Sequence, residues 1–233
     1  MSDDRTHDPD EPFAWSSLVV RGTQSATFLQ GQLSQDLDTI GAQGGWSALL
    51  TPSSEVLATC FVTIVEGGYE LLVARAVGDA ALARLKRFHL RVDCTIALND
   101  ALRGPYNTIG EQIERGEPGP SEFLGLSPQC YGQSFVERTV SFTKGCFTGQ
   151  ELVARLDARG ANVPWRFVRA TGPTREAIAQ RLVASGPATG ASLAGVTSAV
   201  RRDRGVDALG FVHRSALDTP GDDEHGVRVR VIA

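Results

Sequence analysis

The chain has 233 residues, of which 42% are hydrophobic and 21% are charged, a composition typical of a globular protein with one large domain or two small ones. It contains no run of about 18 apolar residues, so the sequence predicts no membrane-spanning helix. The formal net charge of −4 argues against tight nucleic-acid binding, which is usually marked by a basic surface.

The first twelve residues, MSDDRTHDPDEP, are acidic and lack the basic start and the apolar stretch of a secretory signal. We expect residues 1–12 to be a disordered tail and the protein to lie in the cytoplasm. The four cysteines show no C-x-x-C spacing, so no metal site is predicted, and four reduced thiols suit a reducing compartment. Cys60 and Cys94 fall in strand-like runs and are expected to be buried.

The pattern of apolar residues predicts alternating strands and helices in the first hundred residues. In chain order the predicted elements are a strand (16–22), a helix (23–37), several strands (within 44–74), a helix (76–90) and a strand (91–98). The first helix is predicted because Leu29, Leu33 and Leu37 recur every four positions. This order favours an α+β fold with antiparallel pairing.

The second half of the chain is irregular at first and then rich in short alternating runs. Residues 99–139 contain much Gly, Pro and Glu with weak periodicity, and they predict a connector with one short helix. Later runs such as WRFVRATG and GVRVRVIA predict strands of a small β-barrel or sandwich, with a helix over residues 174–185. We place a domain boundary near residue 160.

The stretch TKGCFTGQELVARLDARG, residues 143–160, combines a turn with the start of a helix. The preceding TVSF predicts a strand, and Gly145 and Gly149 predict a tight turn. Thr148 and Glu151 have the spacing of a capping box, which predicts that the helix begins here.

Cys146 lies in this turn, close to the positive end of the predicted helix and two residues from Lys144. Both features favour the thiolate form of a cysteine. Arg155 is placed to pair with Glu151 on the helix surface. These residues alone leave two interpretations open: an activated, partly exposed thiol, or a small residue at a crowded turn.

The same stretch resembles the signature K-G-C-[FY]-x-G-Q-E-x-x-A-R of the YgfZ folate-binding family, which is related to the glycine cleavage T protein. The string LVVRGTQSATFLQGQ and the pair GVTSAV and ALGFVHRSAL are similar to further segments of that family, so the resemblance spans residues 13–220. The matching signature positions are Lys144, Gly145, Cys146, Phe147, Gly149, Gln150, Glu151, Ala154 and Arg155.

The resemblance implies the T-protein fold, with an N-terminal α+β domain (13–160) and a small C-terminal β-barrel (161–233) around a central cavity that holds a folate. It implies tetrahydrofolate or a derivative as the cofactor. Trp15, seven residues before Gly22, matches a tryptophan of the family's folate site, although a tryptophan here could also simply anchor the first strand. Gln150 and Glu151 are further candidates for folate contacts.

Two departures from the family pattern affect this expectation. Residues 99–126 replace a longer stretch, so the α+β domain is shortened and a second aromatic folate contact is missing. Thr108 falls near that position, and Tyr106 is the residue that could substitute for it. The turn TPSSE also lacks the Gly-Arg pair of the family pattern.

The resemblance further implies an accessory role in the assembly or repair of iron–sulfur proteins, with an indirect effect on tRNA modification. Cys146 would be the functional thiol, and Lys144 and Arg155 would contribute to a contact surface. The implied partners are iron–sulfur client enzymes that thiolate tRNA, and a folate. Direct binding of nucleic acid or of a membrane is not expected.

Two alternatives belong to other functional classes. The first is a folate-dependent aminomethyltransferase, which needs a carboxylate beside the folate; Asp36, Asp38 and Asp93 are available, none of them in a recognisable motif. The second is an interaction module whose folate pocket has decayed, which the short 99–126 segment motivates.

Overall fold

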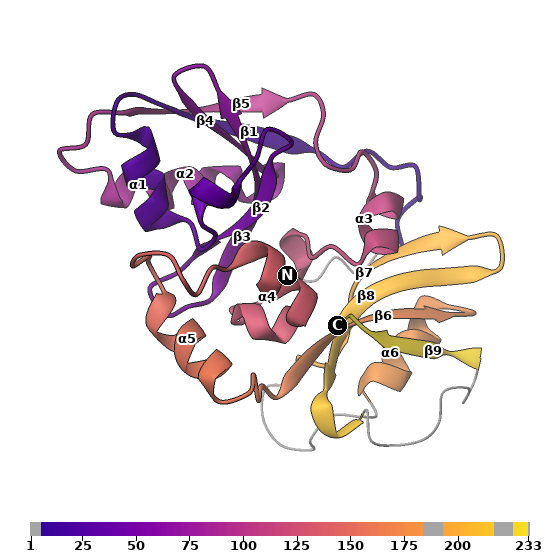
Figure 1. Ribbon diagram of the computed structural model, residues 1–233. Helices are drawn as coiled ribbons and strands as arrows, with labels where there is room; N and C mark the ends of the chain where they lie inside the picture. The colour runs from indigo at the N-terminus through magenta and orange to yellow at the C-terminus, as the bar shows by residue number, and fades with distance from the viewer. Residues whose placement is uncertain (1–5, 184–192, 217–225, 233) are drawn as a thin grey trace.

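The computed structural model describes residues 6–183, 193–216 and 226–232, which form two antiparallel β-sheets joined by a helical segment (Figure 1). The predicted α+β class with antiparallel pairing is therefore confirmed. Within these ranges, every helix is too short or too polar to cross a membrane.

The first sheet has five strands in the order β2-β3-β4-β1-β5. Its strands are β1 (Trp15–Arg21), β2 (Gly45–Leu50), β3 (Val56–Val65), β4 (Gly68–Ala74) and β5 (Thr95–Ala101). Two helices, α1 (Ser25–Gln32) and α2 (Arg75–Phe88), share its core. Leu29 of α1, Leu71 of β4 and Leu85 of α2 are fully buried there, as expected where an apolar helix stripe covers one face of a sheet.

A helical segment connects the two sheets. Its elements are α3 (Ile109–Arg115), η2 (Pro120–Glu122), η3 (Pro128–Tyr131), α4 (Gln133–Thr139) and α5 (Gln150–Ala158). Tyr131 packs against Phe135 of α4 and against Phe167 and Phe211 of the second sheet, with ring centroids 5.0, 5.7 and 5.7 Å away. These buried rings join the segment to the second sheet.

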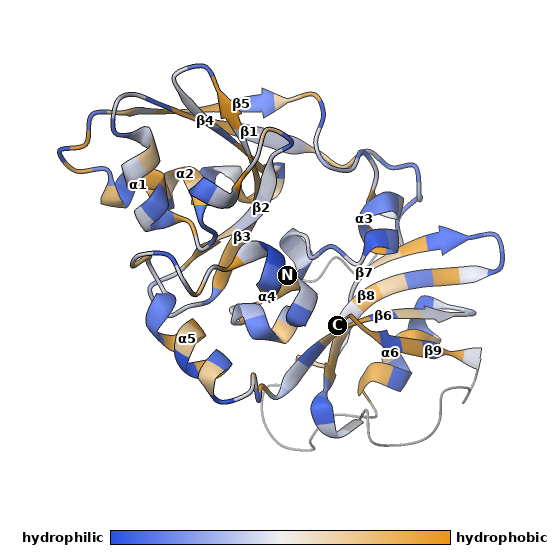
Figure 2. Cartoon of the chain, viewed as in Figure 1, coloured by the Kyte–Doolittle hydropathy of each residue, from blue (hydrophilic) through white to orange (hydrophobic). Residues whose placement is uncertain are grey.

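The second sheet has four strands in the order β7-β8-β6-β9. Its elements are β6 (Trp165–Gly172), α6 (Arg175–Val183), β7 (Gly195–Arg202), β8 (Gly205–His213), η4 (Arg214–Ala216) and β9 (Arg228–Val231). The aromatic core covers one face of this sheet and α6 the other. Hydrophilic residues predominate in α3 and at the end of β7 (Figure 2). Pairing among the described strands leaves β7 and β9 at the edges, so a closed barrel and a boundary at residue 160 stay predictions.

Residues 6–14, which we call the N-terminal strap, are ordered against the rest of the chain. The backbone of His7 forms a bridge with edge strand β7, accepting from the amide of Arg201 and donating to the carbonyl of Ala199. The first two amides of α3 donate to carbonyls of the strap. The prediction of a disordered tail is therefore wrong for residues 6–12, because their backbone groups form hydrogen bonds with β7 and α3. Residues 1–5 lie outside the described ranges.

Three further predictions about local structure are wrong. The first helix stops at Gln32 because Leu33 is extended and bridges to Leu49 of β2. The segment TVSF forms no strand; instead the amide of Ser141 donates to the carbonyl of Ser34. Residues 99–139 contain α3, α4 and two 3₁₀ turns rather than one short helix, since proline and glycine divide this segment into short pieces.

Candidate functional site

The signature turn, residues 141–149, is held by backbone and side-chain hydrogen bonds to the chain around the end of α1. The Nζ atom of Lys144 donates to the carbonyls of Leu33 and Gln35, both at 2.9 Å. The amide of Thr148 donates to the carbonyl of Gly31 at 3.2 Å. The turn is thus held on both sides of Cys146.

Lys144 is 9% exposed, so it faces the interior rather than a partner. Burial lowers the pKa of its ammonium group from 10.5 to about 8, and the carboxylates of Asp36 and Asp38 oppose this shift. Its Nζ atom also lies 5.4 Å from the centroid of the Phe147 ring. The structure therefore gives Lys144 the role of holding the turn in place.

The other side of the turn rests on the β2–β3 hairpin. Gly149 has φ +85°, and a Cβ atom there would lie 2.6 Å from the carbonyl oxygen of Thr51, so only glycine fits without a shift. The Oγ of Ser54 donates to the carbonyl of Gly149 at 2.5 Å. Gly149 precedes α5 without a side-chain cap, so the predicted capping box from Thr148 is wrong: Thr148 is held by α1 instead.

Cys146 is the exposed cysteine of the chain, while Cys60, Cys94 and Cys130 are buried. Two apolar side chains near it in sequence, Phe142 and Leu152, are 42% and 39% exposed. Because its neighbours on both sides are held by hydrogen bonds, the turn presents this thiol at the surface.

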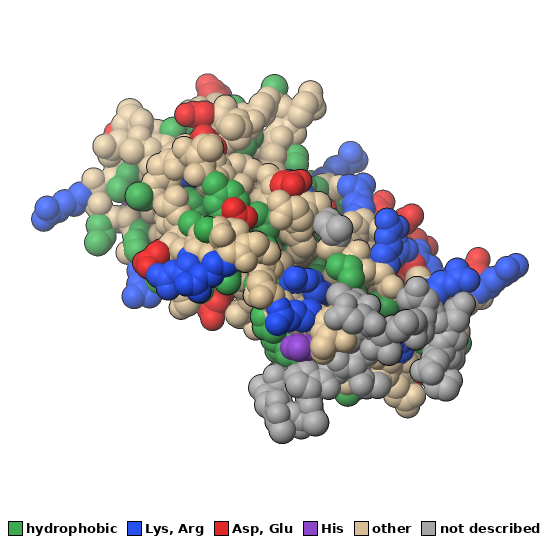
Figure 3. Space-filling model, turned by 60° about the horizontal axis from the view of Figure 1, so that its bottom comes forward, with side chains coloured by type: hydrophobic (Ala, Val, Ile, Leu, Met, Phe, Trp, Pro, Cys, Tyr) green, Lys and Arg blue, Asp and Glu red, His purple; other side chains and the backbone are tan. Residues whose placement is uncertain are grey.

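The predicted pair on α5 is present. Arg155 and Glu151 form an ion pair of 2.6 Å, with both side chains largely exposed. At the start of this helix Glu151 is exposed and Gln150 is half-buried. Figure 3 shows basic side chains in separate groups on one face of the molecule, with acidic and hydrophobic side chains between them. The ion pair between Arg155 and Glu151 is exposed to water, and such pairs contribute little to stability. Arg155 is therefore available for a contact with a partner.

A cavity of about 300 Å³ lies between the two sheets, within the size range of small-molecule sites. The strap, the start of α2, α3, η2 and β7 contribute its wall. The lining residues are His7, Pro12, Phe13, Ala14, Ala74, Arg75, Ala76, Ile109, Gln112, Pro120, Ser121, Glu122 and Ser198. None of these belongs to the signature turn, so the structure separates Cys146 from this cavity.

Glu122 is the most unusual group in the cavity wall, because its carboxyl group is fully buried. It accepts hydrogen bonds from the amide of Gly119 and from Oγ of Ser198, both at 2.7 Å. Burial raises the pKa of Glu122, and the hydrogen bonds to it oppose that rise. Sequence reasoning missed this residue; its one signal is a lone acid between the turn residues GPS and the apolar FLGL.

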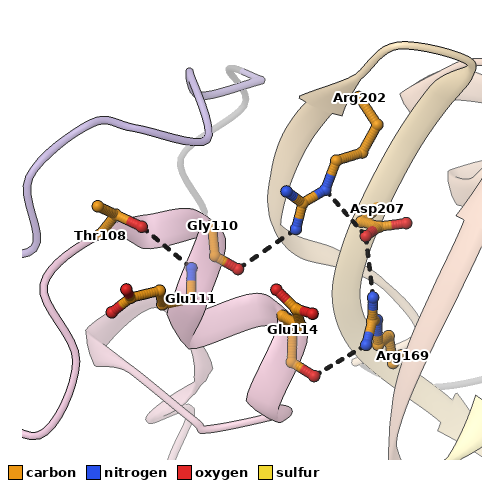
Figure 4. A network of polar contacts seen from close by, with 7 residues as sticks. All are labelled: Thr108, Gly110, Glu111, Glu114, Arg169, Arg202 and Asp207. Carbon is orange, nitrogen blue, oxygen red and sulfur yellow. Dashed lines mark hydrogen bonds and ion pairs between the residues drawn. The ribbon is translucent and has the colours of Figure 1, made fainter.

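The wall formed by α3 is fixed to the second sheet by two arginines that share one carboxylate (Figure 4). Asp207 accepts from Arg169 at 2.9 Å and from Arg202 at 3.1 Å. The same arginines donate to the carbonyls of Glu114 and Gly110 of α3. The position of Ile109 and Gln112 in the cavity therefore depends on the second sheet.

No family model matches the chain. An uncharacterized protein of Haemophilus influenzae is 38% identical over 87% of each chain. The tRNA-modifying protein YgfZ of Klebsiella pneumoniae is 24% identical over 64% of this chain and 67% of its own length. The crystal structure of aminomethyltransferase T of the glycine cleavage system from Bartonella henselae matches with a TM-score of 0.54 and 16% identity, over 88% of this chain and 80% of its own. The chain belongs to the YgfZ-like family with the fold of the glycine cleavage T protein.

In this YgfZ-like chain two of the predicted folate contacts, Trp15 and Tyr106, lie behind the cavity wall, whereas Gln150 and Glu151 of α5 are absent from the described lining. Trp15 is 2% exposed, and its Nε1 donates to the carbonyl of Tyr106 at 2.8 Å. Phe13 contacts both rings, with centroids 4.9 and 4.7 Å away, and of the three it alone is part of the described lining. The sequence thus identified the aromatic cluster but not the ring that faces the cavity.

The turn that departs from the YgfZ pattern has a serine in the left-handed region of the backbone. Ser54 has φ +69°, which is strained for a residue with a side chain. Its hydroxyl group makes the hydrogen bond to Gly149 described above. The serine therefore adds a contact to the signature turn that a glycine could not make.

Proposed function

We propose that this protein is a folate-binding-type accessory protein of iron–sulfur cluster assembly or repair, which acts through Cys146 and affects tRNA modification indirectly. The observation that carries the proposal is an exposed cysteine on a turn whose two sides are held by Lys144 and Gly149. A thiol presented in this way can reach a partner protein, whereas the three buried cysteines cannot.

The cavity supports a folate as the bound molecule. It combines apolar walls with a buried carboxyl group at Glu122 and an amide at Gln112, which match a flat heterocycle carrying donors and acceptors on its edge. Bound tetrahydrofolate would supply a carrier of one-carbon units. Phe13 would contact the ring, and Trp15 with Tyr106 would hold Phe13 in place. An intact cavity favours this proposal over a decayed pocket.

The partners that we propose are iron–sulfur client enzymes of the tRNA-thiolating type. Cys146 has exposed apolar neighbours in Phe142 and Leu152 and an exposed charge in Arg155. A surface with an apolar centre and a polar rim is typical of a protein contact. The proposal includes a cytoplasmic location and no direct contact with nucleic acid.

An aminomethyltransferase is the second candidate, and Glu122 is the observation that favours it. A raised pKa in a buried carboxyl group at a ligand cavity is a mark of acid–base catalysis. Asp36, Asp38 and Asp93 are absent from the described cavity lining, so the carboxylate that this reaction needs would be Glu122. Formation of methylenetetrahydrofolate with release of ammonia and of the free donor thiol, from tetrahydrofolate and an aminomethyl group held on a protein thiol, would identify this activity.

The test of the leading proposal is the variant Cys146→Ala in cells that depend on this protein for tRNA thiolation. We expect loss of complementation with a free energy of unfolding within about 0.5 kcal/mol of the wild type, because the side chain is exposed. Ile64→Ala, at another exposed position, serves as the control and should complement fully. Full activity of Cys146→Ala would overturn the proposal.

Folate binding is tested separately by fluorescence of Trp15. In a background carrying Trp46→Phe and Trp165→Phe, tetrahydrofolate should quench the remaining fluorescence with saturation, because Trp15 contacts Phe13 in the cavity wall. The variant Glu122→Gln should weaken this binding. Absence of saturable quenching would favour the decayed pocket.

A further inference from the structure

A smaller cavity, of about 180 Å³, lies where the helical segment meets the second sheet. Residues of η3 and α4 form one side of it, and residues of β6 and the end of β9 form the other, near the C-terminus (Figure 1). It shares no described lining residue with the cavity between the sheets, and none of its described lining belongs to the signature turn. The small cavity is therefore a separate site.

Gln129 of η3 brings an acceptor without a protein partner to the small cavity. Its side chain is 3% exposed, and its Nε2 donates to the carbonyl of Val153 in α5 at 2.9 Å. This bond fixes the orientation of the side-chain amide, because only the nitrogen can donate to a carbonyl. Oε1 is then a buried acceptor that no described residue satisfies, which is unfavourable unless a donor reaches it from the cavity.

Arg166 of β6 is the residue with a charged side chain among the described residues that line the small cavity. Its Nη1 donates to the carbonyl of Val163 at 3.2 Å. Burial raises the pKa of Cys130, and the charge of Arg166 opposes this rise, so the guanidinium lies close to the residue next to Gln129. A guanidinium that is bonded to a carbonyl and not to a carboxylate can still bind the carboxylate of a ligand.

We propose that the small cavity binds a small hydroxycarboxylate, whose carboxylate pairs with Arg166 and whose hydroxyl group donates to Oε1 of Gln129. The described lining contains no acidic residue, so the ammonium group of an amino acid would place a second positive charge near Arg166 without a partner. A hydroxyl group is a neutral donor and avoids this. Val136, Val231 and Ile232 line the same cavity and suit a short carbon chain.

The size of the cavity agrees with such a ligand. At about 180 Å³ it is below the roughly 300 Å³ at which sites for drug-sized molecules begin, and it is large enough for more than one water molecule. A compound of a few heavy atoms is therefore the expected occupant.

The experiment titrates the full chain with L-lactate, propionate and lactamide and follows amide shifts by NMR. Propionate lacks the hydroxyl group, and lactamide lacks the charge of the carboxylate. For the wild type we expect saturable shifts of the Gln129 side-chain amide and the Gly132 backbone amide with L-lactate. L-lactate should bind about tenfold more tightly than either other compound, as one hydrogen bond or ion pair would give.

Two variants assign the two ends of the ligand. Arg166→Gln should remove the preference for L-lactate over lactamide, and Gln129→Met should remove the preference over propionate. Arg159→Gln, at an exposed position outside the described lining, is the matched control and should keep both preferences.

The comparison of the three compounds on the wild type decides the matter even if a variant folds poorly. Equal binding of all three, or shifts that do not saturate, would mean that water alone satisfies Gln129 and would overturn this inference. A preference over lactamide that survives in Arg166→Gln would also overturn it. The proposed function would stand in each case, because it depends on Cys146 and on the cavity between the sheets.

Discussion

Lys144 shows how a residue next to Cys146 in sequence serves a different purpose in space. Its place beside the cysteine predicts a positive charge at a contact surface. The structure instead turns the ammonium inward, where it donates to the carbonyls of Leu33 and Gln35. Those carbonyls lie more than a hundred residues earlier in the chain, so no local pattern could have shown the contact.

Burial of Lys144 predicts a change of stability with pH. Its pKa is about 8 in the folded protein, against an ordinary value of 10.5, so the unfolded chain binds more protons between these two pH values. The free energy of unfolding should therefore rise with pH across that window, by up to about 3 kcal/mol. Urea unfolding of the wild type and of Lys144→Met at pH 8 and pH 10.5 measures this. A difference between the two proteins that is the same at both pH values would contradict it.

The elements that the sequence predicted correctly are those with their own apolar pattern. Strand β1, the strands β2 to β4 and helix α2 each carry a clear strand or helix period. The predicted helix over residues 23–37 was too long. It ends at Gln32, and Ser34 lies outside it because its Oγ donates to the carbonyl of Thr139. The cavity residue Glu122 and the strap were missed for the same reason, since their partners lie far away in the sequence.

The turn before α5 gives a prediction in which two glycines of one element behave differently. Gly149→Ala should lower the free energy of unfolding by about 2–4 kcal/mol, because its Cβ would meet the backbone at a positive φ. Gly145→Ala should change it by no more than about 0.5 kcal/mol, since nothing lies within 4 Å of the added atom. Urea unfolding compares the two variants. Equal stability of both would show that the hairpin does not fix the turn.

Across the whole molecule, the strap connects elements that are otherwise far apart. It continues into β1 of the first sheet, accepts hydrogen bonds from the start of α3, and bridges to edge strand β7 of the second sheet. It also supplies His7, Pro12, Phe13 and Ala14 to the cavity wall. An edge strand with unpaired backbone groups is prone to association, so the strap protects β7 as well as closing the cavity.

Deletion of residues 1–12 should therefore lower the hydrogen-exchange protection of three separate amides. Those of Ile109, Gly110 and Arg201 lose the strap carbonyls that accept from them, so their hydrogen exchange should become at least about tenfold faster, as expected when a local contact is opened. The variant His7→Ala is the matched control, because it removes the side chain and keeps the backbone bonds. Exchange measured by NMR distinguishes the two: unchanged protection at all three amides in the deletion would mean that the strap is not part of the folded unit. Loss of protection at these amides with the β6–β8 amides unaffected would show that the strap is the separable wall of the cavity.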